Sequence, residues 1–297
     1  IVLLMTRREE RQPVSVDYLG GMLIAGALTT LAVALTDDPV AGREWWVNLV
    51  LYLAAAGFTV AFVWRERVAR TPMLALSLFR SAVFHMLMGG GLIVAMVSVP
   101  VFTIAILGGS YFEGGLNLMR LTVMLPVGAV AGGYLSGWLG YNRTTAIGMA
   151  ISGLGFFLMH FWTDEIADPW FTLNLLLTGL GFGLVIAPIS AAVINSVAER
   201  DRATASALLT VMRLVGMLIG VALLTSRGLG RFYELAGGVG LDDPQYEEKV
   251  RSLEVSSFSD TFFVAALVCL AAVVPAMLIG RGVARRFRLT EVWRAPH

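Results

Sequence analysis

The chain has 297 residues, of which 57% are apolar and 14% are charged, and its mean hydropathy is +0.76. Ordinary soluble domains carry about 25% charged residues, so this composition excludes a soluble globular protein. A formal net charge of +1 implies no nucleic-acid-binding surface, and one cysteine with three histidines cannot supply a disulfide framework or a zinc site.

Apolar stretches long enough to cross a bilayer occur along the whole chain. A hydrocarbon core about 30 Å thick needs about 20 helical residues. Stretches of about that length are apolar on every face rather than alternating, which favours helices over the strands of a membrane barrel. In chain order the eight predicted spans are residues 18–35, 46–64, 84–107, 116–139, 144–162, 170–197, 203–225 and 259–280. The sequence therefore predicts an all-α integral membrane protein with eight transmembrane helices.

The segments between the spans predict the domain organisation. The short linkers 140–143 and 198–202 make their flanking spans antiparallel neighbours, whereas the basic segment with Pro72 is long enough to separate two bundles. The predicted parts are, in order, the end of a preceding span with a cytoplasmic loop (1–17), a two-helix insert (18–64), a cytoplasmic linker (65–83), a six-helix unit (84–281) that contains an extracytoplasmic loop (226–258), and a cytoplasmic tail (282–297).

The distribution of arginine predicts that both ends of the chain are cytoplasmic. Cytoplasmic loops retain Lys and Arg, and the segments on the same side as the termini hold most of the arginines, among them Arg8, Arg65 and Arg285. Six of the seven tryptophans fall at the edges of predicted spans, where the indole ring suits the headgroup layer. A multi-pass protein of a bacterial inner membrane is expected, with the lipid bilayer as its surroundings.

Motifs in the sixth and seventh spans resemble a known family. The similar stretches are 179–183 (GLGFG), Ala187-Pro188, 199–202 (ERDR), 205–208 (ASAL), 213–216 (RLVG) and 220–222 (GVA). Together they resemble the twelfth and thirteenth spans of the fourteen-span drug:proton antiporters of the major facilitator superfamily. Asp17-Tyr18-Leu19-Gly20, and Leu78-Phe79-Arg80 followed by Phe84, are similar to the starts of that family's seventh and ninth spans.

This resemblance implies a fold and a function. The first two spans would be the extra central pair, and the last six would be the C-terminal six-helix half of a major-facilitator fold. The N-terminal six-helix half would be a partner outside this chain. Rocking of the two halves around a midplane site would export a small amphipathic drug or metabolite. A proton gradient, without any cofactor, would supply the energy.

Arg213 is the main candidate for the substrate pathway. It lies near the middle of its predicted span, where an arginine costs about 2.5 to 3.5 kcal/mol, so another group must compensate it. It could bind an anionic substrate group or act on a carboxylate of the N-terminal half, or it could cap carbonyls and bridge helices near a gate. The resemblance implies that spans 84–107 and 170–197 line the cavity, which adds the candidates Phe102, Thr103, Asn174, Thr178 and Ser190.

A second group of residues is expected to act in packing or in conformational change. Arg120 lies about one turn inside its span and can extend its charge to the interface, with Glu113 on a similar helical face. The family's cytoplasmic glycine motif matches 133–140, but its Asp-Arg pair is absent. Several glycines occur in pairs four residues apart, including Gly128 with Gly132, and such pairs permit close packing or sliding of helices. The candidates are Arg120, Gly133, Gly137, Gly140, Arg143, Gly179, Gly183, Pro188, Gly216 and Gly220.

Other chemistry has little support in the spans. No Asp or Glu lies in the interior of any predicted span, and Asp260 lies at an edge, so a carboxylate that carries protons is expected in the N-terminal half. His85 and His160 are interpreted as structural rather than proton-carrying. No Walker A, His-Glu-x-x-His, Gly-x-Ser-x-Gly or Cys-x-x-Cys motif is present, which argues against an enzyme and a metal site. The alternative to transport is a non-transporting membrane partner, or a subunit completed by another chain.

Overall fold

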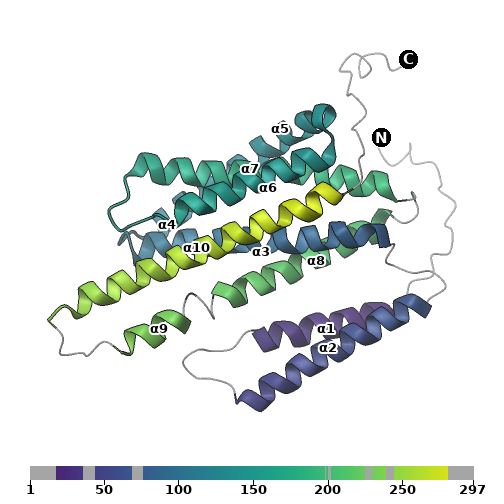
Figure 1. The fold of residues 1–297 in the computed structure, drawn as a ribbon, viewed down its shortest axis with the longest axis horizontal. Helices are drawn as coiled ribbons and strands as arrows, with labels where there is room; N and C mark the ends of the chain where they lie inside the picture. The colour runs from purple at the N-terminus through teal and green to yellow at the C-terminus, as the bar shows by residue number, and fades with distance from the viewer. Residues whose placement is uncertain are drawn as a thin grey trace, which may run out of the picture. The chain divides into compact units, whose positions relative to one another are not determined.

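The structure is a computed structural model that describes residues 18–35, 44–68, 76–197, 199, 202–224, 228, 230–238 and 244–279. The regular structure in these ranges is helical, which confirms the all-α membrane fold (Figure 1). The predicted segments 1–17 and 282–297 lie outside the described residues. The helices are α1 (Tyr18–Leu35), α2 (Trp45–Val68), α3 (Leu76–Ala105), α4 (Tyr111–Thr122), α5 (Met124–Leu139), α6 (Tyr141–Met159), α7 (Asp168–Ser196), α8 (Arg202–Leu223), α9 (Arg231–Ala236) and α10 (Tyr246–Leu278).

Every predicted span overlaps a helix. Among the described residues, six segments are long and apolar enough to cross a membrane: Trp45–Arg65, Arg80–Ala105, Tyr111–Leu139, Asp168–Ser196, Arg202–Ala222 and Tyr246–Leu278. The apolar helix Leu19–Leu35 is shorter than these, and α6 is not among them. The count of eight membrane spans therefore stays a prediction.

The helix ends differ from the predicted spans in two places. Helix α2 continues to Val68 and α3 begins at Leu76, so helix occupies part of the predicted linker 65–83. Helix α10 begins at Tyr246 and takes up the last part of the predicted loop 226–258. Its 33 residues extend about 50 Å, which exceeds a bilayer core of about 30 Å. Hydropathy misses this extension because it detects burial in lipid and not helix formation.

The predicted span 116–139 consists of two helices, α4 and α5, that meet at Val123. Pro126 explains the interruption, because it has no N–H to donate to the carbonyl of Thr122 and its ring crowds that turn. A capping box starts α4. The backbone N–H of Ser110 donates to Glu113 Oε2 at 2.7 Å, and Glu113 N donates to Ser110 Oγ at 3.3 Å.

The chain divides into two compact units at the predicted linker. One unit contains α1 and α2, and the other contains α3 to α10. In the first unit the ring of Phe58 packs against Gly26, and the hydroxyl of Tyr52 donates to the carbonyl of Ala34 at 3.4 Å. Apolar side chains such as Met22 and Val60 are exposed on this hairpin, which suits a lipid environment.

The six-helix unit has the order of two three-helix sets. The first set is α3, the α4–α5 pair and α6, and the second is α7, α8 and α10. Helix α5 of the first set packs on α7 of the second, and α8 of the second set packs on α3 of the first. The middle helix of each set therefore contacts the first helix of the other set. Helices α6 and α10 pack on each other and complete the bundle (Figure 1). The two three-helix sets therefore pack on each other through corresponding helices.

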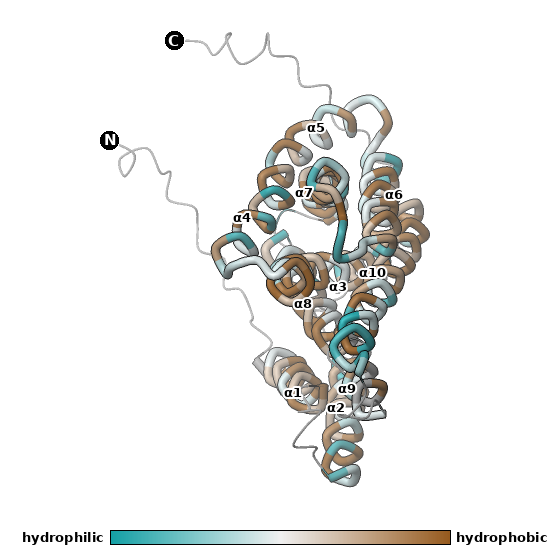
Figure 2. Tube along the Cα trace, turned by 90° about the vertical axis from the view of Figure 1, so that its left-hand side faces the viewer, coloured by the Kyte–Doolittle hydropathy of each residue, from teal (hydrophilic) through white to brown (hydrophobic). Residues whose placement is uncertain are grey.

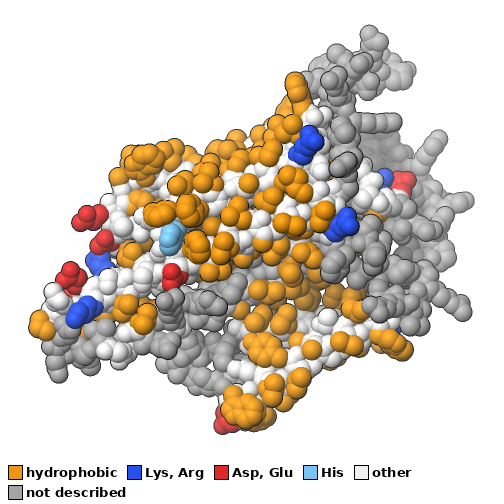
Figure 3. Space-filling model, in the orientation of Figure 1, with side chains coloured by type: hydrophobic (Ala, Val, Ile, Leu, Met, Phe, Trp, Pro, Cys, Tyr) orange, Lys and Arg blue, Asp and Glu red, His pale blue; other side chains and the backbone are white. Residues whose placement is uncertain are grey.

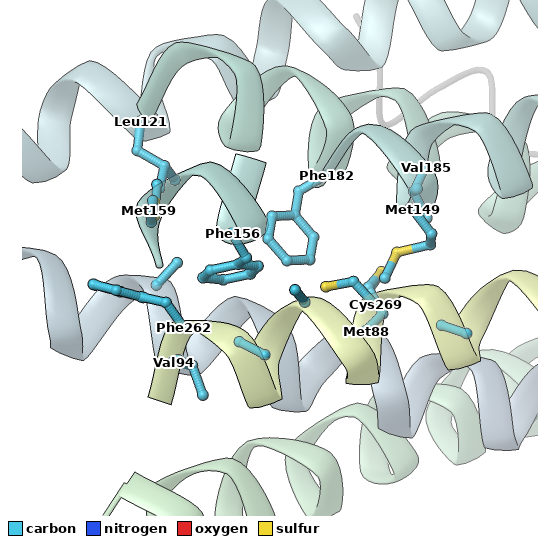
Figure 4. Close-up of a cluster of buried hydrophobic side chains, with 14 of the residues drawn as sticks. Met88, Val94, Leu121, Met149, Phe156, Met159, Phe182, Val185, Phe262 and Cys269 are labelled. Atoms are coloured by element: carbon cyan, nitrogen blue, oxygen red, sulfur yellow. The ribbon is translucent and has the colours of Figure 1, made fainter. Parts of the chain in front are cut away.

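Apolar side chains cover the helices and fill the space between them. Figure 2 shows hydrophobic residues around each helix of the unit, with hydrophilic ones gathered near α9 and the start of α10. Figure 3 shows apolar side chains across the visible face of α6 and α10, with most charges toward the helix ends. Inside, Phe156 lies 6.2 Å from Phe182 and 6.3 Å from Phe262 between ring centres, beside buried Met149 and Cys269 (Figure 4).

Candidate functional site

A seam of glycine contacts joins α5 to α7. A Cβ at Gly128 would lie 2.6 Å from the carbonyl oxygen of Leu180, and a Cβ at Gly183 would lie 2.5 Å from that of Leu125. At Gly132 a Cβ would overlap the carbonyl oxygen of Leu184. Any side chain at these glycines would force the two backbones apart, so the seam depends on their absence.

A second seam joins α8 to α3 in the same way. A Cβ at Gly216 would overlap the carbonyl oxygen of Met86, and a Cβ at Gly220 would lie 2.7 Å from that of Gly90. The pairs follow the same order along both helices, so α3 and α8 are parallel. The order in the first seam, where Gly179 meets Leu121, makes α5 and α7 parallel as well. The two seams therefore occupy corresponding places in the two three-helix sets.

Pro188 lies on the first seam. As a proline inside α7 it has no N–H for the carbonyl of Leu184. That carbonyl is the one against which Gly132 packs, so the close approach of α5 covers a backbone acceptor that α7 itself leaves free. Pro188, a candidate for conformational change, and the close packing of Gly132 therefore meet at one carbonyl.

Other predicted glycines have different surroundings. Nothing lies within 4 Å of a Cβ at Gly137, and a Cβ at Gly133 would be 3.9 Å from Ala187, so this pair forms no tight seam. Gly140 ends α5 and starts α6 with φ of +84°, a conformation that favours glycine. Arg143 is exposed in the first turn of α6. Their gating roles stay predictions.

Arg120 pairs with Asp168, not with Glu113, which is held in the capping box. Its guanidinium donates to Asp168 Oδ1 at 2.6 Å and to Thr172 Oγ1 at 2.7 Å, and thereby ties α4 to the start of α7. Arg251 of α10, which is distant in sequence, also reaches this region, with its Nε 3.3 Å from Asp164 Oδ2. Two arginines therefore hold the connection between α6 and α7 at one end of the unit.

Arginines also hold the opposite end. Arg80 donates to the carbonyl of Leu278 at 3.2 Å, and Arg202 donates to the carbonyl of Ile194 at 3.2 Å. Both carbonyls belong to the last turn of a helix, where a cation is favourable because the final carbonyls lack helical donors. Sequence analysis did not assign Arg80, Arg202 or Arg251 to these contacts, because each partner is distant in sequence or is a backbone atom.

Arg213 is half-buried beside α3. Its carbonyl meets Gly89, and its guanidinium acts electrostatically on the imidazole of His85. Its Nε is buried without a hydrogen-bond partner, and no carboxylate of the described residues forms an ion pair with it. His85 Nδ1 lies 2.7 Å from the carbonyl of Ser81, to which it donates. A guanidinium that is this poorly satisfied at the middle of a span is the polar feature most in need of a partner.

Phe102 and Thr103 lie in a packed region. The ring of Phe102 is fully buried, with ring centres 5.1 Å from Trp162 and 5.4 Å from Phe258. Thr103 Oγ1 donates to the carbonyl of Val99 at 2.9 Å and accepts from Asn117 at 3.1 Å. Both side chains therefore stabilise the packing around the C-terminal end of α3. Their role in the substrate pathway stays a prediction.

The three candidates on α7 also lie apart. Asn174 and Thr178 are buried, and Thr178 Oγ1 donates to the carbonyl of Asn174 at 2.8 Å. Ser190 is exposed and donates to the carbonyl of Ile186 at 2.8 Å. The cavity between α3, α8 and α10 is lined by none of the six predicted pathway residues. The described part of the chain does not gather them into one pocket.

His160 has a structural role at the end of α6. Its Nδ1 donates to the carbonyl of Ser259 at 2.9 Å, and the Ser259 hydroxyl donates to the carbonyl of His160 at 2.6 Å. This reciprocal pair ties α6 to α10. The described residues contain no group of three or more His, Cys, Asp or Glu that could hold a metal ion.

Comparison with known proteins shows similarity to lipid transporters. No family model matches the chain. A triacylglyceride transporter of Mycolicibacterium smegmatis is 31% identical over 93% of this chain and 55% of its own length, and one of Mycolicibacterium hassiacum is 34% identical over 78% and 46%. One of Mycobacterium tuberculosis is 30% identical over 90% and 57%. The chain spans about half the length of these curated relatives.

A solved structure shares the fold. A bacterial homologue of the human lysosomal transporter Spinster, in an inward-facing and unoccupied conformation, matches 88% of this chain and 69% of its own with a TM-score of 0.50 and 15% identity. The relatives and this structure are all named as transporters. The chain is therefore an all-α membrane protein that is similar to triacylglyceride transporters over about half of their length and that shares the fold of a solved transporter.

Proposed function

We propose that the chain serves in secondary transport of small amphipathic molecules that carry acyl chains. The observation that carries this proposal is the pair of parallel glycine seams, α5 on α7 and α8 on α3. Small residues let two helices approach to backbone contact, and such contact would keep each pair of helices together while the unit moves. The relatives named triacylglyceride transporters suggest the class of substrate.

The six-helix unit would move as one body during alternating access. Arg120 with Asp168 and Arg251 with Asp164 hold one end, while Arg80 and the carbonyl of Leu278 hold the other. The N-terminal six-helix half is the proposed partner against which this body rocks. Arg213 would then supply a cation to the pathway, and its missing partner would be a polar substrate group or a carboxylate of that half.

Proteoliposomes test the proposal directly. The full transporter that contains this chain is reconstituted, and transfer of a fluorescent triacylglyceride is followed with and without an imposed proton gradient. Faster transfer than in protein-free vesicles, and loss of that gain in Arg213→Ala, are expected. Transfer equal to that of protein-free vesicles would refute lipid transport and would favour the non-transporting membrane partner.

Proton-coupled export of drugs is a second candidate, which rests on the resemblance to fourteen-span antiporters at residues 179–222. In this case cells that express the full transporter would extrude a lipophilic dye, and an uncoupler would abolish the extrusion. Dye retention unchanged by deletion of the gene would exclude this substrate class. An inner-membrane location with both chain ends in the cytoplasm belongs to either proposal.

A further inference from the structure

An apolar crevice lies between α8 and α10, and α3 forms its floor. Its volume is about 90 Å³. Met86, Leu87, Gly90, Gly91 and Val94 come from α3, Gly216, Ile219, Gly220 and Leu224 from α8 and the residue after it, and Thr261, Val264, Ala265 and Val268 from α10. No lining residue is charged. The hydroxyl of Thr261 donates within its own helix to the carbonyl of Ser257 at 2.8 Å, so the crevice presents no unsatisfied side-chain donor.

The walls of this crevice cannot close on each other. Helix α8 is fixed to α3 by the seam at Gly216 and Gly220. Helix α10 is fixed to the same floor where a Cβ at Gly91 would lie 2.9 Å from Cys269 Sγ, and it is fixed to α6 where a Cβ at Gly153 would lie 3.4 Å from the carbonyl of Ala266. Each wall is therefore held by its own tight contacts, and these contacts keep the crevice open.

The other three-helix set has no such opening. There the third helix, α6, packs on both α7 and α5. The corresponding helix α10 packs on α3, but within the described residues it makes no extensive contact with α8. The two sets have similar glycine seams, but they differ in whether the third helix contacts the second helix of its own set. In the described part of the chain, the crevice is therefore a feature of the second set alone.

The dimensions and chemistry of the crevice fit one hydrocarbon chain. From Gly216 to Leu224 it extends about 12 Å along α8, which is close to the depth of one leaflet of hydrocarbon, about 15 Å. Its volume holds roughly six to nine water-sized groups, comparable with part of an acyl chain. Water gains no hydrogen bonds in such a lining, and an empty crevice would lose the dispersion contacts of its walls.

We propose that the crevice binds one acyl chain of a bilayer phospholipid, which enters from the leaflet at the C-terminal end of α8. A single narrow slot accepts one chain and leaves the headgroup at the membrane surface. The bound chain would bridge α8 and α10, which the protein itself leaves apart. This site is separate from the transport proposed above and does not depend on it.

Photolabelling of the chain in nanodiscs tests this site. The probe is a phosphatidylcholine with a diazirine on one acyl chain, and labelled positions are mapped by mass spectrometry. Labels should concentrate on Ile219, Val264 and Val268, severalfold above the level at lipid-exposed positions of α10. Val274, with 64% of its surface exposed, is a reference for general lipid contact. Labelling of Val274 at or above the level of Val268 would overturn the proposal.

A matched pair of variants checks the same point. Val268→Trp fills the crevice, whereas Leu267→Trp places the same ring on the neighbouring residue, which is 50% exposed and does not line the crevice. Labelling of the crevice should fall severalfold in Val268→Trp and stay unchanged in Leu267→Trp. Equal labelling of the crevice in both variants would refute the site. If Val268→Trp fails to fold, the photolabelling pattern of the unsubstituted protein decides the question.

Two further outcomes would name another occupant. Loss of crevice labelling on addition of unlabelled triacylglyceride would assign the crevice to that lipid and overturn the phospholipid. If the crevice is not labelled and a cysteine introduced by Val268→Cys crosslinks to α1 or α2, the occupant of the crevice would be the α1–α2 hairpin. A failed triacylglyceride transfer assay with intact crevice labelling would refute the proposed transport alone.

Discussion

Replacing Gly132 with alanine should destabilise the bundle, and the same change at Gly137 should not. Both glycines lie inside α5, where alanine favours helix by about 0.5 to 1 kcal/mol. At Gly137 nothing lies within 4 Å of the new Cβ, so only this gain remains. At Gly132 the new Cβ meets the carbonyl oxygen of Leu184, and forced backbone shifts of this kind cost about 1 to 3 kcal/mol.

The helix preference is common to both variants, so their difference isolates the seam. Gly132→Ala should be less stable than Gly137→Ala by about 1 to 3 kcal/mol. Unfolding of the purified chain in mixed micelles, followed by circular dichroism as the fraction of denaturing detergent rises, measures this difference. Equal stability of the two variants would show that α5 and α7 are not in close backbone contact, and the seam would be wrong.

Three other residues give predictions of different kinds. Removing the pair of Arg120 with Asp168 should lower the unfolding free energy by only about 0 to 1 kcal/mol, because the side chains are 36% and 71% exposed; a double-mutant cycle measures it, and a larger coupling would contradict this reasoning. Gly140→Ala, at φ of +84° and ψ of 163°, should cost about 1 to 3 kcal/mol in the same unfolding assay, and no loss would argue against this positive-φ connection between α5 and α6. Arg213→Lys should retain more triacylglyceride transfer than Arg213→Ala if charge matters in the pathway, and equal loss in both would point to guanidinium geometry.

The helices could be predicted from the sequence because length and apolarity are properties of one continuous segment. The apolar stretch that ends at Trp64, or the one that begins at Phe84, can be recognised as a span without knowing which other helices it packs against. The extension of α10 before residue 259 could not be found in this way, since its Glu and Lys residues are typical of any exposed segment. Its position only becomes clear where Arg251 contacts Asp164 across a long sequence separation.

The contacts of the candidate site were less predictable, and α5 shows why. Gly128 with Gly132 and Gly133 with Gly137 have the same spacing, and the second pair lies five residues later, about 140° around the helix. Helix α5 is apolar around its whole circumference, so no polar face indicates which side meets a neighbour. The structure places Gly132 against Leu184 and leaves Gly137 open. Phe102 shows the same limit, because an aromatic residue in a span is equally compatible with a cavity wall and a packed core.

Gly132 packs against the carbonyl of Leu184, which Pro188 leaves without its helical donor. This contact connects helix packing with helix bending more directly than the spacing of the glycines does. Proline removes one hydrogen bond from α7, which lowers the cost of bending at that turn. The freed carbonyl then lies under the backbone of α5, where a side chain would block both the contact and any sliding past it. In the second seam the carbonyl of Met86 meets Gly216 without a proline four residues later, since that position is Gly90. We therefore expect α7 to bend at its seam, whereas the proline inside α3, Pro100, lies beyond the α3 seam, so that the two corresponding seams contribute differently to one rocking motion.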